Sequence, residues 1–168
     1  MSYTDHVKSS RETTAGCAVV TLSDTRTIET DTSGKKMAEL LLIAGHVVVE
    51  HRVMKDDPIE LESWLNQLFE RSDVDAILTT GGTGISRRDQ TIGVIERIVD
   101  QPLPGFGELF RVLSYEQIGS GAMLSRAVGG IAKGKLIFAM PGSTAAVELA
   151  MTKLILPELG HLVFEMRK

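Results

Sequence analysis

The chain has 168 residues and a mass of 18.3 kDa, and 43% of its residues are hydrophobic, which is enough for one domain with a substantial core. Its net charge of −4 at pH 7 argues against a general nucleic-acid-binding protein, because such proteins normally present a basic face. Cys17 is the single cysteine, so neither an internal disulfide nor a multi-cysteine zinc site can form, and a cytoplasmic location is expected.

The sequence also argues against secretion and membrane insertion. The first fifteen residues carry charges throughout and contain no apolar stretch. No later run approaches the roughly twenty apolar residues that cross a bilayer, so no membrane partner is expected. We expect residues 1–14 to form a flexible N-terminal arm and residues 15–168 to form one folded domain.

Short apolar segments alternate with helical patterns in the first half of the chain. The predicted strands are Cys17–Leu22, His46–Val53 and Val74–Thr80. Capping residues at Thr30–Ser33 predict a helix that ends near Gly45. The sequence Asp56-Asp57-Pro58 predicts the start of the next helix, with Asp57 as its cap. Strands that alternate with helices in this way indicate a mostly parallel sheet with helices on both faces.

The second half of the chain predicts further helices around a β-hairpin. The predicted helices are Asp89–Val99, Glu108–Gln117 and a last helix from about Pro157. The two prolines within residues 101–107 predict a turn or a lid-like loop. Ala127–Ala132 and Leu136–Met140 predict two strands joined by a tight turn, and Ser143 caps the helix that follows. The predicted fold class is therefore α/β: a single three-layer domain around a mostly parallel sheet, with a small β-hairpin.

The segment Thr79–Asp89, T-T-G-G-T-G-I-S-R-R-D, carries the strongest functional signal. Its three glycines allow backbone N–H groups to approach an anion, and the first turn of the helix expected to follow adds partial positive charge. Asp89 would repel a bound phosphate unless a cation lay between them, so it points to Mg²⁺ or to a proton-transfer role. The alternative is a tight turn that needs glycine for backbone reasons alone.

Several polar residues follow the predicted strands directly. The carboxyl ends of parallel strands meet at one edge of a sheet, where ligands bind in such folds. Asp24 follows the first strand and Asp56 the second, so both can reach the same cleft as Asp89. Turn or helix capping is the alternative for these two residues. Ser143, after the hairpin, either donates to a ligand or only caps its own helix.

A second candidate anion site lies at Thr30–Gly34, where Lys35 and Lys36 follow as phosphate partners. A plain capping box explains this segment nearly as well. The segment 129–136, G-G-I-A-K-G-K-L, has the glycine and lysine spacing of a P-loop. It places Leu136 where Mg²⁺ needs a hydroxyl group, so we discount it.

Taken in order, four motifs resemble the MoaB/MogA family of molybdenum cofactor biosynthesis, whose domain also occurs in gephyrin. They are T-L-S-D at 21–24, D-T-S-G at 31–34, T-T-G-G-T-G-I-S-R-R-D at 79–89 and M-P-G-S at 140–143. The resemblance covers the chain from about Gly16 to its end. The segment 105–114 and the sequence S-R-A at 125–127 are similar to the MoaB branch in particular.

This resemblance implies binding of molybdopterin by an α/β domain that forms a homotrimer or a hexamer. The family reaction is the Mg²⁺- and ATP-dependent transfer of AMP onto the terminal phosphate of molybdopterin, with release of pyrophosphate. Because nucleophile and leaving group are both phosphates, the protein mainly has to align them and neutralise their charge. Other molybdenum cofactor enzymes are possible partners under this interpretation.

The resemblance also assigns residues. Asp89 corresponds to the essential aspartate of the family, and Asp56 to a second acidic position near the metal or the pterin phosphate, so both are expected to hold Mg²⁺. The other expected ligand-binding residues are Gly81, Gly82, Thr83 and Gly84 of the phosphate cradle, with Ser23, Asp24, Ser86 and Ser143. This chain has Lys55 where the MogA branch often has proline, which leaves Asp57 as an alternative to Asp56.

Three alternatives remain open from the sequence. The protein could bind molybdopterin without adenylylating it, serve as a scaffold for other cofactor-pathway enzymes, or hydrolyse nucleotides. The sequence leaves open trimer versus hexamer, which subunit supplies which site residue, and whether metal insertion also occurs. It also leaves open whether Arg111 or Arg126 reaches a ligand.

Overall fold

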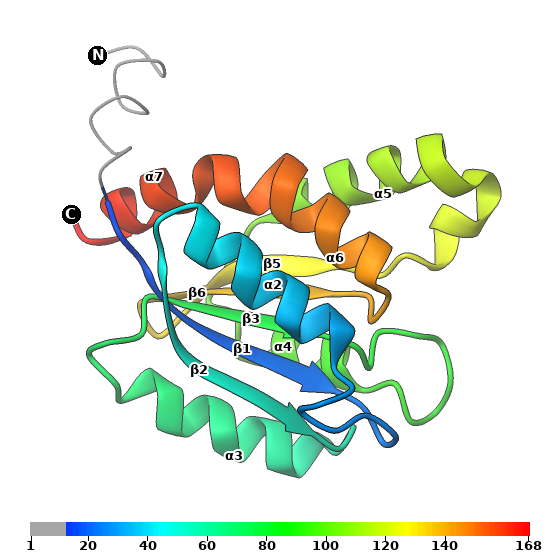
Figure 1. Cartoon of the computed structure of the whole chain (residues 1–168), viewed down its shortest axis with the longest axis horizontal. Coiled ribbons are helices and arrows are strands. Elements are labelled where there is room, and N and C mark those ends of the chain that lie inside the picture. The colour runs from blue at the N-terminus through cyan, green and yellow to red at the C-terminus, as the bar shows by residue number, and fades with distance from the viewer. Residues whose placement is uncertain (1–12) are drawn as a thin grey trace.

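The structure, a computed structural model, describes residues 13–168, so the arm predicted at residues 1–14 lies almost wholly outside the described residues. Strands and helices alternate along the chain as far as the helical residues 104–124, after which two strands and then further helical segments follow one another (Figure 1). The strands are β1 (Gly16–Leu22), β2 (Val47–Met54), β3 (Ala76–Thr80), β4 (Gln101–Pro102), β5 (Val128–Ala132) and β6 (Lys135–Met140). The helical elements are α2 (Thr32–Ile43), α3 (Pro58–Phe69), α4 (Thr91–Ile98), α5 (Pro104–Ile118), η1 (Gly119–Leu124), α6 (Thr144–Ala150), η2 (Met151–Ile155) and α7 (Leu156–Met166).

Within residues 13–168 the strands form one six-stranded sheet in the order β2-β1-β3-β6-β5-β4. The pairs β1–β2, β1–β3 and β3–β6 are parallel, whereas β5 is antiparallel to both β6 and β4. This confirms the predicted parallel sheet with a hairpin. Thr21 pairs with both Val53 and Thr80, and Thr80 pairs with Met140, so the carboxyl ends of four strands lie level at one edge.

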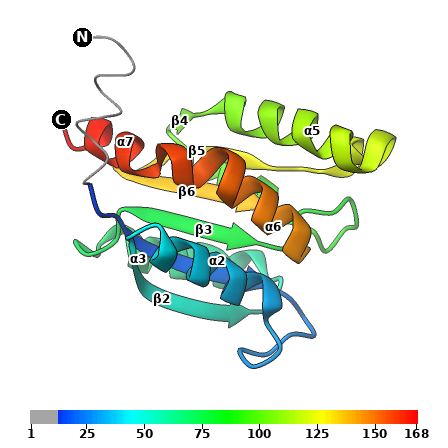
Figure 2. The same cartoon turned by 45° about the horizontal axis from the view of Figure 1, so that its top comes forward.

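Helices cover both faces of the sheet, as predicted (Figures 1 and 2). On one face α2, α5, α6 and α7 pack over one cluster of buried residues, and on the other α3 and α4 pack over a second cluster. Successive strand residues point to opposite faces, so Val19 enters the first cluster while Ala18 and Val20 enter the second. Trp64 and Leu68, four residues apart on α3, lie on its buried side.

Two predicted boundaries were wrong. The helix predicted from Asp89 begins at Thr91, which leaves Asp89 in the preceding loop. The loop predicted at 101–107 instead forms β4 and the first turn of α5, because Pro104 is tolerated in a first turn, where its missing N–H has no helical partner.

The start of the C-terminal helix was predicted correctly, because α7 begins at Leu156 and the sequence predicted a helix from about Pro157. This helix continues a helical segment formed by α6 and the π-helical turn η2. The π-helical turn precedes Pro157, whose ring removes one backbone donor and would otherwise crowd the preceding turn. Among the described helices, none is both long enough and apolar enough to span a bilayer.

Candidate functional site

Loops from four strands meet at the carboxyl edge of the sheet. After β1, Ser23 N donates to Met54 O of β2 at 2.9 Å. After β3, Gly81 N donates to Met140 O of β6 at 3.1 Å. The hydroxyl of Thr80 also donates to Pro141 O, at 2.8 Å. These bonds bring together the predicted site residues that follow β1, β2, β3 and β6.

The glycine loop follows β3 and is packed too tightly for side chains at two positions. Gly81 and Gly82 have positive φ angles of 93° and 64°. A Cβ on Gly81 would lie 2.2 Å from Leu22 O, and one on Gly82 would lie 2.1 Å from Thr91 Oγ1. Thr91 N donates to Gly82 O at 3.1 Å, which places the start of α4 beside Gly82. The helix therefore contributes partial positive charge next to the loop, although it starts later than predicted.

Asp89 is half-buried at the end of this loop. Its Oδ2 accepts a hydrogen bond from Ser86 N at 3.0 Å and a short one from Ser86 Oγ. These bonds from Ser86, helped by the Gly84 backbone and the positive charge of Arg126, lower the pKa of Asp89. Asp89 is therefore an ionised carboxylate, as a metal-binding role requires. The hydroxyl of Ser86, predicted to bind ligand, is occupied by Asp89.

Asp56 is half-buried across from the glycine loop. Partial burial, followed by the negative charges of Asp89 and Asp24, raises the pKa of Asp56 to about 6, and the charge of Arg88 opposes this shift. Within residues 13–168 the Asp56 carboxylate makes no hydrogen bond or ion pair. Its neighbour Asp57 instead caps α3, accepting from Ile59 N and Glu60 N at 2.9 Å each.

Asp24 and the two serines take part in local interactions. Asp24 forms an ion pair of 2.7 Å with Arg88, which ties the loop after β1 to the glycine loop. Ser23 Oγ accepts from Arg26 N at 3.1 Å and so stabilises its own turn. Ser143 Oγ accepts from Ala146 N at 3.1 Å and caps α6. All three residues lie at the predicted edge, and their hydroxyl and carboxylate groups have local structural roles there.

The second candidate anion site is a helix cap. Asp31 is fully buried and accepts from Gly34 N, the hydroxyl of Thr21 and His51 Nε2 at 2.8 to 2.9 Å. A buried carboxylate would repel an anion. Lys35 instead donates to the Glu29 carbonyl, and Lys36 forms an exposed ion pair with Glu39. The structure therefore supports the capping alternative.

Two arginines that the sequence left unassigned contact the site loops. Arg26 Nη1 donates to Ser33 Oγ at 2.9 Å and to Gly142 O at 3.3 Å, joining the loops after β1 and β6. Arg126 Nη1 donates to Gly84 O at 3.2 Å. Sequence analysis missed Arg26 because an isolated arginine after a polar turn resembles an ordinary surface charge. Its position two residues after Asp24, in the polar loop that follows the first predicted strand, was the available signal.

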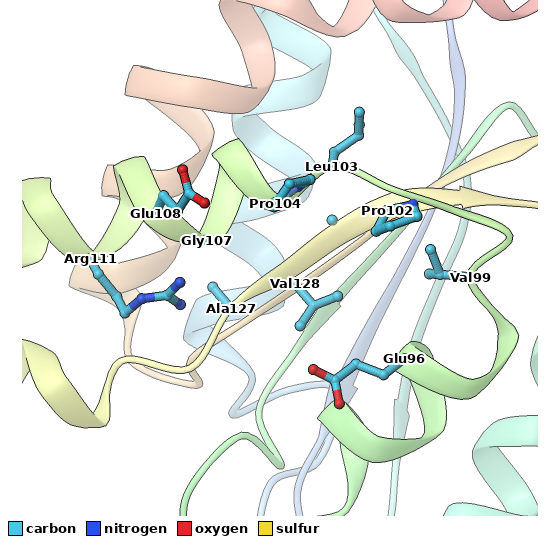
Figure 3. A pocket seen from close by; sticks show the side chains of 11 residues that line it. Glu96, Val99, Pro102, Leu103, Pro104, Gly107, Glu108, Arg111, Ala127 and Val128 are labelled. Atoms are coloured by element: carbon cyan, nitrogen blue, oxygen red, sulfur yellow. The ribbon is translucent and has the colours of Figure 1, made fainter.

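A pocket of about 340 Å³ is lined in part by Ala127, the residue that follows Arg126 in the sequence (Figure 3). Its lining includes Val99, Pro102, Pro104, Ala127 and Val128, together with Glu96, Glu108 and Arg111. Figure 3 shows the carboxylate of Glu96 and the guanidinium group of Arg111 pointing toward the space beside Ala127. Apolar walls with a few charged groups are typical of sites that bind small molecules.

The acidic residues of the site fit a magnesium ion that is also held by a phosphate ligand. No cluster of three or more His, Cys, Asp or Glu side chains placed for a metal occurs in the described part of the chain. Mg²⁺, however, is usually bound by one or two carboxylates together with substrate phosphates. Asp56 has no partner among the described residues and lies close enough to Asp89 for its pKa to be raised by that charge. Asp56 and Asp89 are therefore the candidate ligands for such an ion.

The sequence resembles those of known molybdenum cofactor biosynthesis proteins. A family model described as "Probable molybdopterin binding domain" matches residues 18–161. Molybdenum cofactor biosynthesis protein B of Bacillus cereus is 51% identical over 169 residues, covering 100% of this chain and 99% of that protein. The corresponding protein of Bacillus subtilis is 49% identical over 153 residues, covering 90% of each.

Solved structures show the same fold. A crystal structure of a molybdenum cofactor biosynthesis protein B superimposes with a TM-score of 0.89 at 52% identity, covering 92% of this chain and 96% of that one. The tungsten cofactor synthesizing protein MoaB from Pyrococcus furiosus superimposes with a TM-score of 0.82 at 36% identity, covering 92% and 98%. The predicted fold class is thereby confirmed.

Proposed function

This chain belongs to the family of molybdopterin-binding domains, and from that premise we propose that it acts in molybdenum cofactor biosynthesis as a molybdopterin adenylyltransferase. The observation that carries the proposal is the pair of carboxylates beside the glycine loop at the sheet edge, with Asp56 against Gly82 and Asp89 against Gly84. A loop that offers backbone N–H groups binds phosphate, and the carboxylates suit a cation that bridges to it.

In the proposed reaction, an oxygen of the terminal phosphate of molybdopterin attacks the α-phosphorus of ATP. The bond from that phosphorus to the oxygen bridging to the β-phosphate breaks, and pyrophosphate leaves with the electron pair. Gly81, Gly82, Thr83 and Gly84 form the proposed phosphate cradle. The N–H of Gly81 already donates to Met140 O, so the fixed N–H dipoles of Gly82, Thr83 and Gly84 are the ones that would stabilise the developing charge. Asp56 and Asp89 would hold Mg²⁺, which supplies positive charge to the phosphates when bound.

The pocket of Figure 3 is the proposed position of the pterin ring. Arg126 contacts the glycine loop, and the next residue, Ala127, lines the pocket, so the two regions adjoin. A molecule with a phosphate at one end and a ring at the other can reach both. The carboxylates of Glu96 and Glu108 are acceptors for the N–H groups of a pterin ring.

We also propose that the protein forms a homotrimer or a hexamer through α5 and η1. These two elements expose large apolar side chains, from Leu109 at 54% to Met123 at 80% exposed. The exposed set comprises Leu109, Val112, Tyr115, Ile118, Met123 and Leu124, here called the α5–η1 surface. Contiguous apolar surface of this kind is typical of contacts between subunits.

The deciding experiment is an adenylylation assay with purified protein, molybdopterin, ATP and Mg²⁺. Adenylylated pterin and an equal amount of pyrophosphate are the expected products, and neither should form when Mg²⁺ is chelated. Tight pterin binding without turnover would show that the protein is a non-catalytic binding protein. ATP hydrolysis that does not need pterin would instead support a nucleotide hydrolase.

A further inference from the structure

The hydroxyl of Thr91 is buried without a partner. Thr91 begins α4, is 1% exposed, and its Oγ1 makes no hydrogen bond within residues 13–168. Native proteins rarely leave a buried hydroxyl unpaired, because it has lost its bonds to water. The other such hydroxyl in this part of the chain, that of Thr79, lies inside β3. Thr91 differs because it lies at the edge of the site.

The hydroxyl of Thr91 and the carboxylate of Asp56 converge on one small space over Gly82. The position that a Cβ on Gly82 would take lies 2.1 Å from Thr91 Oγ1 and 2.8 and 2.9 Å from the two carboxylate oxygens. Because residue 82 is glycine, that space stays open. Thr91 is held there by the hydrogen bond from its N–H to Gly82 O, and its β-branched side chain has few rotamers.

The two groups are chemically complementary. The carboxylate of Asp56 is an acceptor without a partner among the described residues, and the hydroxyl of Thr91 is a donor in the same situation. Both groups lie within 3 Å of the same point beside Gly82, so the gap between them is short. Hydrogen bonds to ionised groups are about twice as strong as neutral ones, so a bond between the two groups is strongest when Asp56 is ionised.

We infer that Thr91 is a positioning residue, whose hydroxyl donates a hydrogen bond to Asp56 and fixes the direction of that carboxylate toward the glycine loop. The functional consequence rests on the proposed function, in which Asp56 helps to hold Mg²⁺. Carboxylates that bind metals are themselves held by hydrogen bonds, and loss of such a partner commonly weakens metal binding about 10- to 100-fold. The hydrogen bond itself does not depend on any ligand.

A thermal double-mutant cycle tests the hydrogen bond in the ligand-free protein. Thr91→Val keeps the shape of the side chain and removes the hydroxyl, and Thr91→Ser keeps the hydroxyl. At pH 8 we expect Thr91→Val to lower Tm by about 3 °C or more, since a bond to a charged group is lost. Thr91→Ser should recover most of that loss. In an Asp56→Ala background, the same Thr91→Val change should leave Tm unchanged or raise it.

The same cycle gives a different result if Thr91 does not bond to Asp56. If the hydroxyl is unpaired in solution, replacing it with a methyl group removes an unsatisfied polar atom, so Tm should rise in both backgrounds. An equal change in Tm with and without the Asp56 carboxylate would overturn the inference. The cycle thus separates a bond to Asp56 from general packing at this position.

Binding of Mg²⁺ with a non-hydrolysable ATP analogue, measured by calorimetry, tests the functional consequence. We expect Thr91→Val to weaken this binding about 10- to 100-fold and Thr91→Ser to weaken it less than about threefold. Unchanged affinity in Thr91→Val would overturn the positioning role. If the unaltered protein does not bind the metal nucleotide, the proposed function fails, and the thermal cycle still decides whether Thr91 holds Asp56.

Discussion

The carboxylate of Asp56 lies so close to the backbone of Gly82 that no side chain fits between them. Both of its oxygens are within 3 Å of the position that a Cβ on Gly82 would occupy, at 2.8 and 2.9 Å. The backbone at Gly82 also has a positive φ of 64°, which L-residues adopt at a cost of roughly 1–2 kcal/mol. The close approach of Asp56 to the glycine loop thus depends on Gly82.

Substitution of Gly82 by alanine should therefore harm both stability and binding. We expect Tm to fall by about 3 °C or more and the affinity for Mg²⁺-nucleotide to fall at least about tenfold, as the new methyl group displaces Asp56 or Thr91. Gly93→Ala is the matched control: Gly93 lies in α4 with no atom near its Cβ position, so alanine there should stabilise the helix by about 1 kcal/mol. Equal effects of both changes on binding would contradict the proposal.

The pKa of Asp56 predicts how stability depends on pH. Folding raises the pKa of Asp56 from 3.8 to about 6. At pH values between these two, Asp56 is protonated in the folded protein and ionised in the unfolded chain. Stability therefore falls as pH rises through that range. Asp56→Asn should remove this loss, so its gain in Tm should grow from pH 4 to pH 7 and then level off. Allowing for solvent screening, we expect a gain of roughly 2–4 °C at pH 8. If Asp56→Asn raised Tm equally at pH 4 and pH 8, the raised pKa of Asp56 would not be the cause.

The same group predicts the pH dependence of metal binding. A cation binds the ionised carboxylate, so protons compete with Mg²⁺ for Asp56. The affinity for Mg²⁺-nucleotide, measured by calorimetry at several pH values, should weaken as pH falls through about 6. Binding in Asp56→Asn should be weaker throughout and should lose this step.

Mutation of Asp89 should affect turnover and not stability, whereas mutation of Asp57 should affect stability and not turnover. Asp89→Asn removes the charge of a half-buried loop residue, so turnover in the adenylylation assay should be abolished while Tm and pterin affinity stay close to those of the unaltered protein. Asp57→Ala removes the cap of α3 and should cost about 1 kcal/mol of stability while leaving turnover intact. A large loss of Tm in Asp89→Asn would instead make Asp89 a structural residue.

The pocket of Figure 3 should contribute to pterin binding and not to nucleotide binding. Replacing both Glu96 and Glu108 with glutamine removes the charge from two acceptors, and we expect pterin affinity, followed by fluorescence titration, to fall about tenfold. The affinity for Mg²⁺-nucleotide should not change. Glu62→Gln, at an exposed position on α3, serves as the control. A parallel loss of nucleotide affinity would show that the pocket is not a separate subsite.

The α5–η1 surface should determine the oligomeric state. Met123→Glu together with Tyr115→Glu places charges on two exposed apolar positions, and light scattering after size exclusion should show dissociation to monomers. Ile59→Glu is the control, because Ile59 is 79% exposed but lies on α3, away from this surface. A monomeric unaltered protein, or an oligomer that persists in the double variant, would contradict the proposed assembly.

Most of the fold could be predicted from the sequence because its signals are local. Alternating strands and helices, the hairpin, and the caps formed by Asp57 and Ser143 depend on residues a few positions apart. The errors occurred where one local signal competed with another. Pro104 was interpreted as a helix breaker, and it instead lies in the first turn of α5.

The candidate site could be predicted only in part. The glycine loop and its final carboxylate were visible as a motif, and the strand order placed Asp24 and Asp56 near them. The sequence predicted Asp57 as a helix cap but left it as an alternative to Asp56 in the site. The structure confirms the cap, in which Asp57 accepts from Ile59 N and Glu60 N. Whether Asp56 and Asp89 bind a metal stays a prediction.

By itself, the sequence determined which segments form strands, where the glycines permit close approach, and which polar residues end each strand. Only the tertiary structure decided that Arg26 joins Ser33 to Gly142, that Arg126 contacts Gly84, and that Thr91 and Asp56 both lie beside Gly82. The physical reason is that periodicity and capping act over one or two turns of chain. Contacts between loops depend instead on the register of strands that are far apart in sequence.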